Sequence, residues 1–306
     1  MSSTYHGQIV RRATRRCSRV TWGGLVTVPS TSESSEGRGA DRVDTTVVHP
    51  ARRYNYWLGG KDNFAVDRES GDQIAAVYPG VRTLARENRA FLGRAVRFLT
   101  EEVGIRQFLD IGTGIPSAEN THEVAQSVVP ESRVVYVDND PMVLVHARAL
   151  LTSDPAGATA YLDADLRDPE KILADPQLHT TLDLSQPVGL VLIAVTHFLT
   201  DDDRPHEHVA RLLDALPSGS WLALTHFTTD HIPNQIVERM YAEFASGRMK
   251  QDAVPRDRAE FARFFTGLEL AEPGIVPVTE WRPQVPPEQR PALADASIYG
   301  AVARKP

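Results

Sequence analysis

The sequence predicts an α/β fold built on a mostly parallel, doubly wound sheet of seven strands. Short apolar runs alternate with helix-like segments from residue 107 to residue 245. The first run leads into a glycine-rich turn, and the last two runs have no helix between them. Because strands that alternate with helices form parallel sheets, we expect the first five strands to be parallel and the last two to pair as an antiparallel edge.

The segment Arg106–Pro116 (RQFLDIGTGIP) is the centre of this prediction. An apolar run at 107–111 is followed by the turn Gly112-Thr113-Gly114 and then by a helix-like segment at 117–128. The glycines let backbone N–H groups approach a ligand closely, and the next helix presents its N-terminus there. A strand, a tight glycine turn and a helix form the opening unit of a nucleotide-binding α/β fold.

The other elements follow from hydrophobic spacing and from helix start signals. Apolar side chains recur at helical spacing in 83–100, RVVYV predicts a second buried strand, and Pro141 suits the first turn of the next helix. The expected strands are 107–111, 133–137, 158–162, 187–194, 220–224, 268–278 and 297–303. The expected helices are 67–77, 83–100, 117–128, 141–151, 169–175, 203–216, 233–245 and 256–265.

Composition excludes several classes of protein. A net charge of −7 and a pI near 5.8 argue against general affinity for nucleic acid, which needs concentrated Lys and Arg. Cys17 is the one cysteine, so no internal disulfide can form, and a cytoplasmic location fits. No apolar run reaches the length of a membrane span, and we expect no membrane partner.

The chain divides into three parts. Residues 1–44 are rich in Arg and Ser and poor in acidic residues, and we expect a disordered tail. An organelle transit peptide has a similar composition, but a flexible tail or translation from an upstream start codon is the favoured interpretation. Residues 45–104 are expected to form a helical cap, and residues 105–306 the ligand-binding domain.

The aromatic segment HPARRYNYWLGG, at 49–60, allows two interpretations. Its tyrosines and tryptophan could pack the cap onto the sheet, or they could form a lid over a ligand. The pair Gly59-Gly60 and the polar residues Lys61, Asp62 and Asn63 that follow favour the lid.

Three acidic residues lie at or near successive strand ends, namely Asp110, Asp138 and Asp165. Ligands of open α/β sheets bind outside the carboxyl ends of the strands. A carboxylate at the second strand end can accept two hydrogen bonds from a ribose diol. Strand-end aspartates also cap helices, but three in register favour a nucleoside ligand.

The glycine turn favours a nucleoside without phosphates. A dinucleotide site prefers G-x-G-x-x-G, whereas Ser117 stands at the third glycine position, and Pro116 lacks an N–H that could face a pyrophosphate. No Walker lysine is present. These departures disfavour a nicotinamide-dependent oxidoreductase and favour an adenosyl ligand.

The motifs DIGTGIP, YVDNDP and DADLRDP, in this order, resemble those of class I S-adenosylmethionine-dependent methyltransferases. The segment HPARRYNYWLGGKDNF narrows the resemblance to a bacterial family of S-adenosyl methyltransferases with unassigned substrates, formerly a domain of unknown function. The resemblance covers Val47–Lys305. It implies a Rossmann-like fold with a helical N-terminal cap and S-adenosyl-L-methionine as cofactor.

The resemblance also implies roles for particular residues. Asp110 and the glycine turn would shape the methionine side of the pocket, Asp138 would bind the ribose, and Asp165 would lie beside the adenine. Lys61 could pair with the cofactor carboxylate. The cofactor-binding set implied in this way is Tyr56, Gly60, Lys61, Asn63, Asp110, Gly112, Thr113, Gly114, Asp138, Asn139, Asp165, Leu166 and Ala194.

Methyl transfer requires an aligned acceptor and, where the acceptor carries a proton, a group that removes it. His197, after the fourth strand, is the first candidate base, and His226, after the fifth, is the second. Both could instead be hydrogen-bonded core histidines, since each has aromatic neighbours. No metal-ligand pattern such as H-E-x-x-H is present.

Two functions remain open from the sequence. The first is methylation of a small molecule. The second is a regulatory protein that binds S-adenosylmethionine or S-adenosylhomocysteine without turnover. The sequence indicates neither the acceptor nor the oligomeric state.

Overall fold

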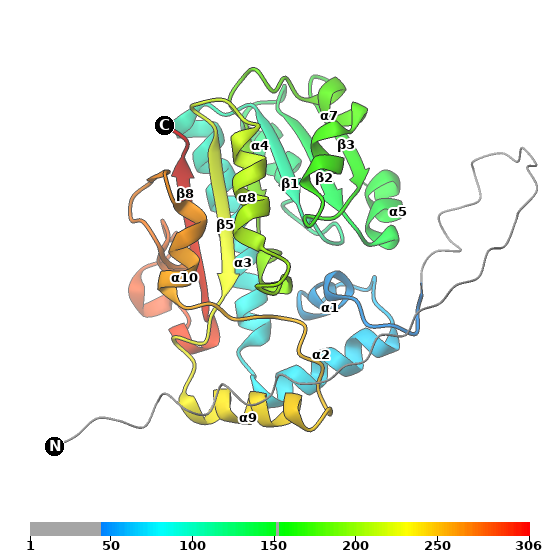
Figure 1. The fold of residues 1–306 in the computed structure, drawn as a ribbon, viewed down its shortest axis with the longest axis vertical. Coiled ribbons are helices and arrows are strands. Elements are labelled where there is room, and N and C mark those ends of the chain that lie inside the picture. Colours follow the sequence, from blue (N-terminus) through cyan, green and yellow to red (C-terminus); the bar gives the residue numbers. More distant parts are fainter. Residues whose placement is uncertain (1–43, 151–152) are drawn as a thin grey trace, which may run out of the picture. The chain divides into compact units, whose positions relative to one another are not determined.

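A computed structural model describes residues 44–150 and 153–306 (Figure 1). The expected tail at 1–44 lies outside the described residues, except for Asp44. The described residues belong to one compact unit, which contains both the cap helices and the sheet. None of the helices in this part of the chain combines the length and the apolar character of a membrane span.

The sheet has the order β3-β2-β1-β4-β5-β8-β6, with β7 also paired to β8. Strands β1 to β5 are mutually parallel and β8 is antiparallel to β5, which confirms the predicted fold class. The strands are β1 (Gln107–Ile111), β2 (Arg133–Asp138), β3 (Ala158–Asp163), β4 (Gly189–Leu192), β5 (Trp221–Phe227), β6 (Glu269–Leu270), β7 (Val276–Pro277) and β8 (Ile298–Arg304).

The sixth strand differs from the prediction. The region 268–278 forms two strands of two residues each, β6 and β7, and both pair with β8. Pro273-Gly274 lies between them, and proline cannot donate a hydrogen bond to a ladder. β8 therefore lies between β5 and these short pieces, instead of forming the edge itself.

Helices cover both faces of the sheet. They are α1 (Pro50–Trp57), α2 (Ala65–Val77), α3 (Val81–Phe98), α4 (Thr121–Val128), α5 (Pro141–Leu150), α6 (Pro169–Ala174), α7 (Pro176–Thr181), α8 (Pro205–Asp214), α9 (Asn234–Ala245) and α10 (Arg258–Ala262). Successive strand residues point to opposite faces, so Phe108 joins the core beneath α3 whereas Leu109 joins the core beneath α8. Figure 1 shows α1, α2 and α9 at the carboxyl ends of the parallel strands.

The helices depart from the sequence prediction in two unexpected helices and one later start. Helix α1 was not predicted as a helix, and α7 was missed. Helix α4 begins at Thr121 instead of residue 117, because Asn120 and Glu123 form a capping box that fixes its start. The residues between the glycine turn and α4 are a loop, and the side chain of Arg89 donates hydrogen bonds to the Ala118 carbonyl in it.

Candidate functional site

A cavity of about 400 Å³ lies at the carboxyl ends of β1, β2 and β4. The residues after these strands form its floor, and α1, α3 and α9 supply its other walls. The cavity lining contains most of the residues expected to bind a cofactor. They are Asp110, Gly112, Thr113, Gly114, Asp138, Asn139, Asp165, Leu166 and Ala194, together with His197.

The glycine turn has the backbone that its sequence suggests. Gly112 and Gly114 have φ of 74° and 68°, in the left-handed region that glycine adopts without strain. A Cβ atom on Gly112 would lie 2.4 Å from Cγ2 of Val195, so only glycine fits there. A Cβ atom on Gly114 would meet nothing closer than Ala51, at 4.0 Å, so the backbone is open to a ligand at this point.

Asp138 is nearly buried, with 6% of its surface exposed. Its carboxylate accepts the backbone N–H of Gly114 at 2.8 Å and that of Asp140 at 2.9 Å. Burial raises the pKa of Asp138 to about 6, although these hydrogen bonds act in the opposite direction. The carboxylate therefore fixes the glycine turn and still borders the cavity.

Asp110 lies at the floor of the cavity and accepts a hydrogen bond of 2.6 Å from the Thr121 hydroxyl, at the start of α4. Burial raises its pKa to about 6 as well. Asp165 is different, since it is held by Arg167 and by the Asn139 amide. Burial raises the pKa of Asp165, but these hydrogen bonds outweigh burial and lower the pKa to about 2.

Four residues expected at the cofactor lie outside the cavity lining: Tyr56, Gly60, Lys61 and Asn63. Tyr56 lies in the last turn of α1, and the other three lie in the connection from α1 to α2. The Asn63 amide donates to the Asn55 side chain at 2.9 Å and to the Gly60 carbonyl at 3.0 Å, and the Tyr56 hydroxyl donates to Asp72. Lys61 is exposed. The hydrogen bonds of Asn63 and Tyr56 are made within α1, α2 and the segment between them. The structure therefore does not bring these four residues to the cavity.

Instead, the cap borders the cavity through α1 and the residue before it. His49, Arg53 and Trp57, spaced four residues apart, line the cavity from one side of the helix, and Tyr54 joins them. The sequence reasoning missed this face because HPARRYNYW was not treated as a helix. His49 accepts a hydrogen bond from the backbone of Ala51 as the N-cap of α1, and Pro50 at the first helical position was the signal available in the sequence.

The segment after β4 turns sharply into the cavity. Ala194 has a φ of 55°, which is uncommon for a residue with a side chain, and its N–H donates to the Thr225 hydroxyl at 2.9 Å. Such strained residues cluster at ligand sites. The turn ends β4 two residues earlier than expected and brings Val195 against Gly112.

The two candidate histidines have different surroundings. His226 is fully buried and does not line the cavity. Its Nε2 lies 3.1 Å from the Val254 carbonyl and its Nδ1 lies 2.8 Å from the Thr196 hydroxyl. Burial lowers its pKa well below the usual value, so the ring is neutral. Nε2 also lies 3.3 Å from the Arg256 guanidinium, so both ring nitrogens are used inside the protein.

His197 borders the cavity, and burial lowers its pKa to about 3. Its Nδ1 lies 3.4 Å from the backbone N–H of Phe227, in a long hydrogen bond. Since a backbone N–H only donates, Nδ1 is bare and the proton of the neutral ring is on Nε2. This tautomer offers the cavity a hydrogen-bond donor, which does not support the expected role as a base.

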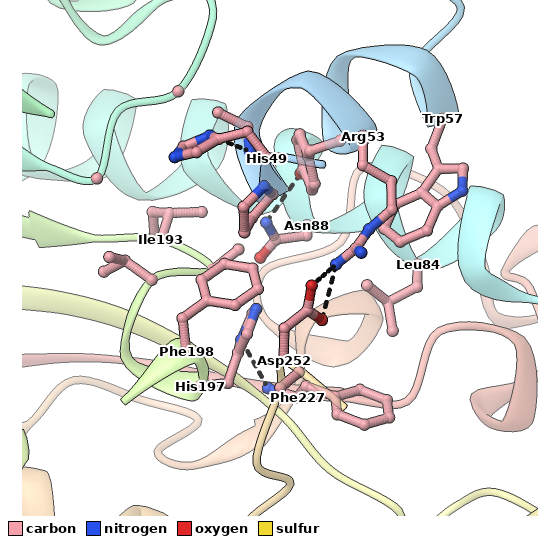
Figure 2. A pocket seen from close by; sticks show the side chains of 18 of the residues that line it. His49, Arg53, Trp57, Leu84, Asn88, Ile193, His197, Phe198, Phe227 and Asp252 are labelled. Atoms are coloured by element: carbon pink, nitrogen blue, oxygen red, sulfur yellow. Dashed lines mark hydrogen bonds and ion pairs between the residues drawn. The ribbon is translucent and has the colours of Figure 1, made fainter. Parts of the chain in front are cut away.

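A buried ion pair connects the cap with the loop after α9. The Arg53 guanidinium contacts both oxygens of Asp252, at 2.9 and 2.8 Å, and stacks against the Trp57 ring. Figure 2 shows Asp252 between Arg53 and His197. The loop is also held to the strand ends, since the N–H of Val254 donates to the His197 carbonyl at 2.7 Å.

Asn88 presents an unpaired acceptor to the same cavity. It is completely buried, and its amide nitrogen donates to the Tyr54 hydroxyl at 2.9 Å. The Tyr54 hydroxyl in turn donates to the Ala85 carbonyl at 2.8 Å, so it receives the hydrogen from Asn88. This chain fixes the orientation of the amide and leaves Oδ1 without a partner among the described residues. Figure 2 shows this oxygen directed away from α3, toward Phe198.

The rest of the cavity is apolar. Its walls come from the cap, from the segment after β4, from the end of β5 and from α9, and they include Ile74, Leu84, Phe198, Phe227, Met240 and Phe244. In the part of the chain that the structure describes, no three His, Cys, Asp or Glu side chains are placed to hold a metal ion. The cavity thus has a polar end at the strand carboxylates and an apolar end beneath α9.

This geometry defines a class of protein. A parallel sheet with an antiparallel β8, a glycine turn after β1, a carboxylate after β2 and a cavity extending past β4 form the Rossmann-like fold of a class I methyltransferase. An adenosyl ligand fits this site, because the Gly114 backbone is open to the cavity and Asp138 borders it.

The chain belongs to the S-adenosyl methyltransferase family, whose model matches residues 36–306. A DUF574 family protein from Streptomyces avermitilis is 50% identical, with a TM-score of 0.82, over 87% of this chain and 100% of the other. A proposed methyltransferase from Thermobifida fusca is 40% identical, with a TM-score of 0.76, over 88% and 98% of the two chains. A comparison with curated proteins gives no match.

The protein is therefore an S-adenosylmethionine-dependent methyltransferase, as the sequence motifs indicated. Neither the family nor these related structures favours the alternative of a cofactor-binding protein without turnover.

Proposed function

We propose that this enzyme methylates a small molecule that is held between the cap helices and the sheet. The supporting observation is that one cavity contains both the strand-end carboxylates and the apolar walls beneath α9. Cofactor and acceptor would therefore occupy adjoining parts of the same enclosure. Helices α1 and α9 cover this enclosure, which suits a small acceptor better than a polymer.

In this proposal, the polar end of the cavity holds the cofactor. Asp138 would accept hydrogen bonds from the ribose hydroxyls, and Asp165, Asn139 and Leu166 would lie along the adenine. The backbone at Gly112, Thr113 and Gly114, above Asp110, would face the methionine part. When bound, the cofactor supplies a methyl group on a positively charged sulfur, which leaves as a thioether once the acceptor takes the carbon.

Ala194 and His197 would then border the acceptor. Both line the cavity at the point where the segment after β4 enters it. The net charge of −7 does not favour a nucleic-acid acceptor. The single cysteine fits a cytoplasmic enzyme, where thiols stay reduced.

The experiment is a labelling assay with methyl-labelled S-adenosylmethionine and a bacterial extract separated by size. We expect label in the small-molecule fraction and a matching release of S-adenosylhomocysteine. Asp138→Ala serves as the control that lacks the ribose contact and should release much less. Label found only on protein or nucleic acid would contradict a small-molecule acceptor.

A further inference from the structure

Three polar groups face the apolar part of the cavity, and together they specify what an acceptor must carry. The Asp252 carboxylate and the Asn88 Oδ1 atom can only accept hydrogen bonds, whereas the Nε2–H of His197 donates one. They come from the loop after α9, from α3 and from the segment after β4. Figure 2 shows Asp252 beside His197, with the Asn88 oxygen directed toward the same space.

Each group is held in place by the protein. The Arg53 guanidinium contacts both oxygens of Asp252, and this ion pair fixes the position of the carboxylate. The hydrogen bonds through Tyr54 fix the Asn88 amide. Buried polar atoms are rarely left unpaired, and a fixed acceptor facing a cavity is satisfied most simply by a ligand that donates.

The surrounding walls restrict the remainder of the acceptor. Leu84, Phe198, Phe227, Met240 and Phe244 offer apolar and aromatic contact to a ring. A carboxylate on the ligand would face Asp252 and the Asn88 oxygen, which cannot donate a hydrogen bond to it. The negative charge of Asp252 would also repel it. Lys250, which also lines the cavity, is exposed to solvent, where its charge is screened.

We propose that the acceptor is an uncharged aromatic compound with a hydroxyl or amino group. A hydroxyl shares its one proton between Asp252 and the Asn88 oxygen, whereas an amino group gives one proton to each, and either group accepts from His197. This inference rests on the proposed function. As the heteroatom of the acceptor forms its bond to the methyl carbon and the carbon–sulfur bond breaks, the acceptor's proton passes to the Asp252 carboxylate. Specificity then excludes aromatic acids, because they lack the proton that Asp252 and Asn88 require.

The test uses the full chain saturated with S-adenosylhomocysteine and three probes on one ring system: 2-naphthol, 2-methoxynaphthalene and 2-naphthoate. Calorimetry measures the affinity of each probe. We expect 2-naphthol to bind about 10-fold more tightly than either of the others, the factor that one hydrogen bond to a charged group contributes. 2-Methoxynaphthalene keeps the ring but has no proton to donate, and 2-naphthoate carries the excluded charge.

Two variants assign the preference to residues. Asp252→Asn should reduce the preference for 2-naphthol over 2-naphthoate to less than about 3-fold, and Asn88→Leu should reduce the preference for 2-naphthol over 2-methoxynaphthalene. Asp72→Asn, whose carboxylate pairs with Arg82 away from the cavity, is the matched control and should change neither ratio. Melting temperatures of all variants separate loss of binding from loss of fold.

The outcomes separate the two proposals. If the wild type fails to bind S-adenosylhomocysteine, the proposed function is wrong before the acceptor is considered. If it binds S-adenosylhomocysteine but binds 2-naphthoate or 2-methoxynaphthalene as tightly as 2-naphthol, or binds no probe, the proposed acceptor class is wrong. If Asn88→Leu weakens S-adenosylhomocysteine and leaves the probe ratios unchanged, Asn88 serves the cofactor and the proposed role for it is overturned.

Discussion

The Asp138 carboxylate accepts the backbone N–H of Gly114 at 2.8 Å, and so joins the end of β2 to the glycine turn after β1. Two motifs that are separated in sequence thus form one structural unit. The same carboxylate also accepts the N–H of Asp140. A residue expected to bind the ribose therefore also fixes the backbone of the glycine turn.

This double role changes the expected effect of Asp138→Ala. Loss of hydrogen bonds to a charged acceptor, about 1.5–3 kcal/mol, should weaken S-adenosylhomocysteine binding roughly 10- to 150-fold. A surface residue at a strand end would leave stability unchanged, but Asp138 is buried. The N–H groups of Gly114 and Asp140 lose their acceptor, and relief of the buried charge offsets only part of this. We expect the free energy of unfolding to fall by about 1–3 kcal/mol in urea titrations.

Asn139→Ala is the control for this prediction, because the side-chain amide of Asn139 donates to Asp165 and lies at the exposed end of the motif. It should weaken cofactor binding less than Asp138→Ala. Wild-type affinity in Asp138→Ala would refute the ribose assignment and make Asp140 the next candidate.

The contact between Gly112 and Val195 predicts a rescue. Gly112→Ala places a Cβ atom 2.4 Å from Val195 and requires alanine at a φ of 74°. Strain and overpacking together should cost about 2–4 kcal/mol of unfolding free energy. Gly114→Ala has a similar φ and no close contact, so it should cost only about 1 kcal/mol. Adding Val195→Gly to Gly112→Ala removes both the Cγ2 contact at 2.4 Å and the Cβ contact at 2.6 Å, and should recover part of the loss. An equal loss in both single variants would contradict the packing argument.

Both the stability of the protein and its affinity for the cofactor should depend on pH through Asp138, and stability is considered first. Burial raises its pKa to about 6, so between about pH 4 and pH 6 the native state holds more protons there than the unfolded chain does. Its contribution to the free energy of unfolding therefore falls as the pH rises through this window and is constant above it. Asp110, with its pKa also raised to about 6, acts in the same direction.

Ribose hydroxyls need the ionised carboxylate. Affinity for S-adenosylhomocysteine should accordingly fall as the pH drops below about 6, by a factor that approaches about 10 per pH unit. Calorimetry in buffers of different ionisation enthalpy should show release of a proton on binding. Asp138→Asn should bind more weakly and show a flatter profile; a profile as steep as that of the wild type would assign the titration to another group.

The sequence predicted the sheet, and it predicted which residues meet at the carboxyl ends of β1, β2 and β3. The parallel strands alternate with helices in a fixed order, and the residues that follow β1, β2 and β3 must meet at one edge of the sheet. Asp110, Gly112, Asp138 and Asp165 therefore line the cavity as expected. Periodicity and topology are sufficient for this part, because each residue is placed by the strand that precedes it.

The apolar end of the cavity could not be predicted in the same way. Asp252 lies in a loop whose course depends on contacts with Arg53 and His197, residues that are distant in sequence. Asn88 lies within an expected helix, but its unpaired oxygen follows from its bond to Tyr54. Within the cap, residues 60–63 do not reach the cavity for a local reason, since the hydrogen bonds of Asn63 turn the chain back on α1.

The two histidines that the sequence treated as alternative bases should respond differently to the same substitution. A glutamine side chain at position 226 cannot place polar atoms where both ring nitrogens of His226 lie. In His226→Gln, the Thr196 hydroxyl or the Val254 carbonyl therefore loses its partner in a fully buried site. We expect a loss of about 1–3 kcal/mol in the free energy of unfolding.

His197 makes one long hydrogen bond, to the Phe227 N–H, and glutamine can still accept it. His197→Gln should therefore change stability by less than about 1 kcal/mol, while it alters the hydrogen-bond donor that faces the acceptor. Urea denaturation of the two variants, beside wild type, measures the difference. If His197→Gln is the more destabilised of the pair, His197 is the structural histidine and its place at the acceptor is wrong.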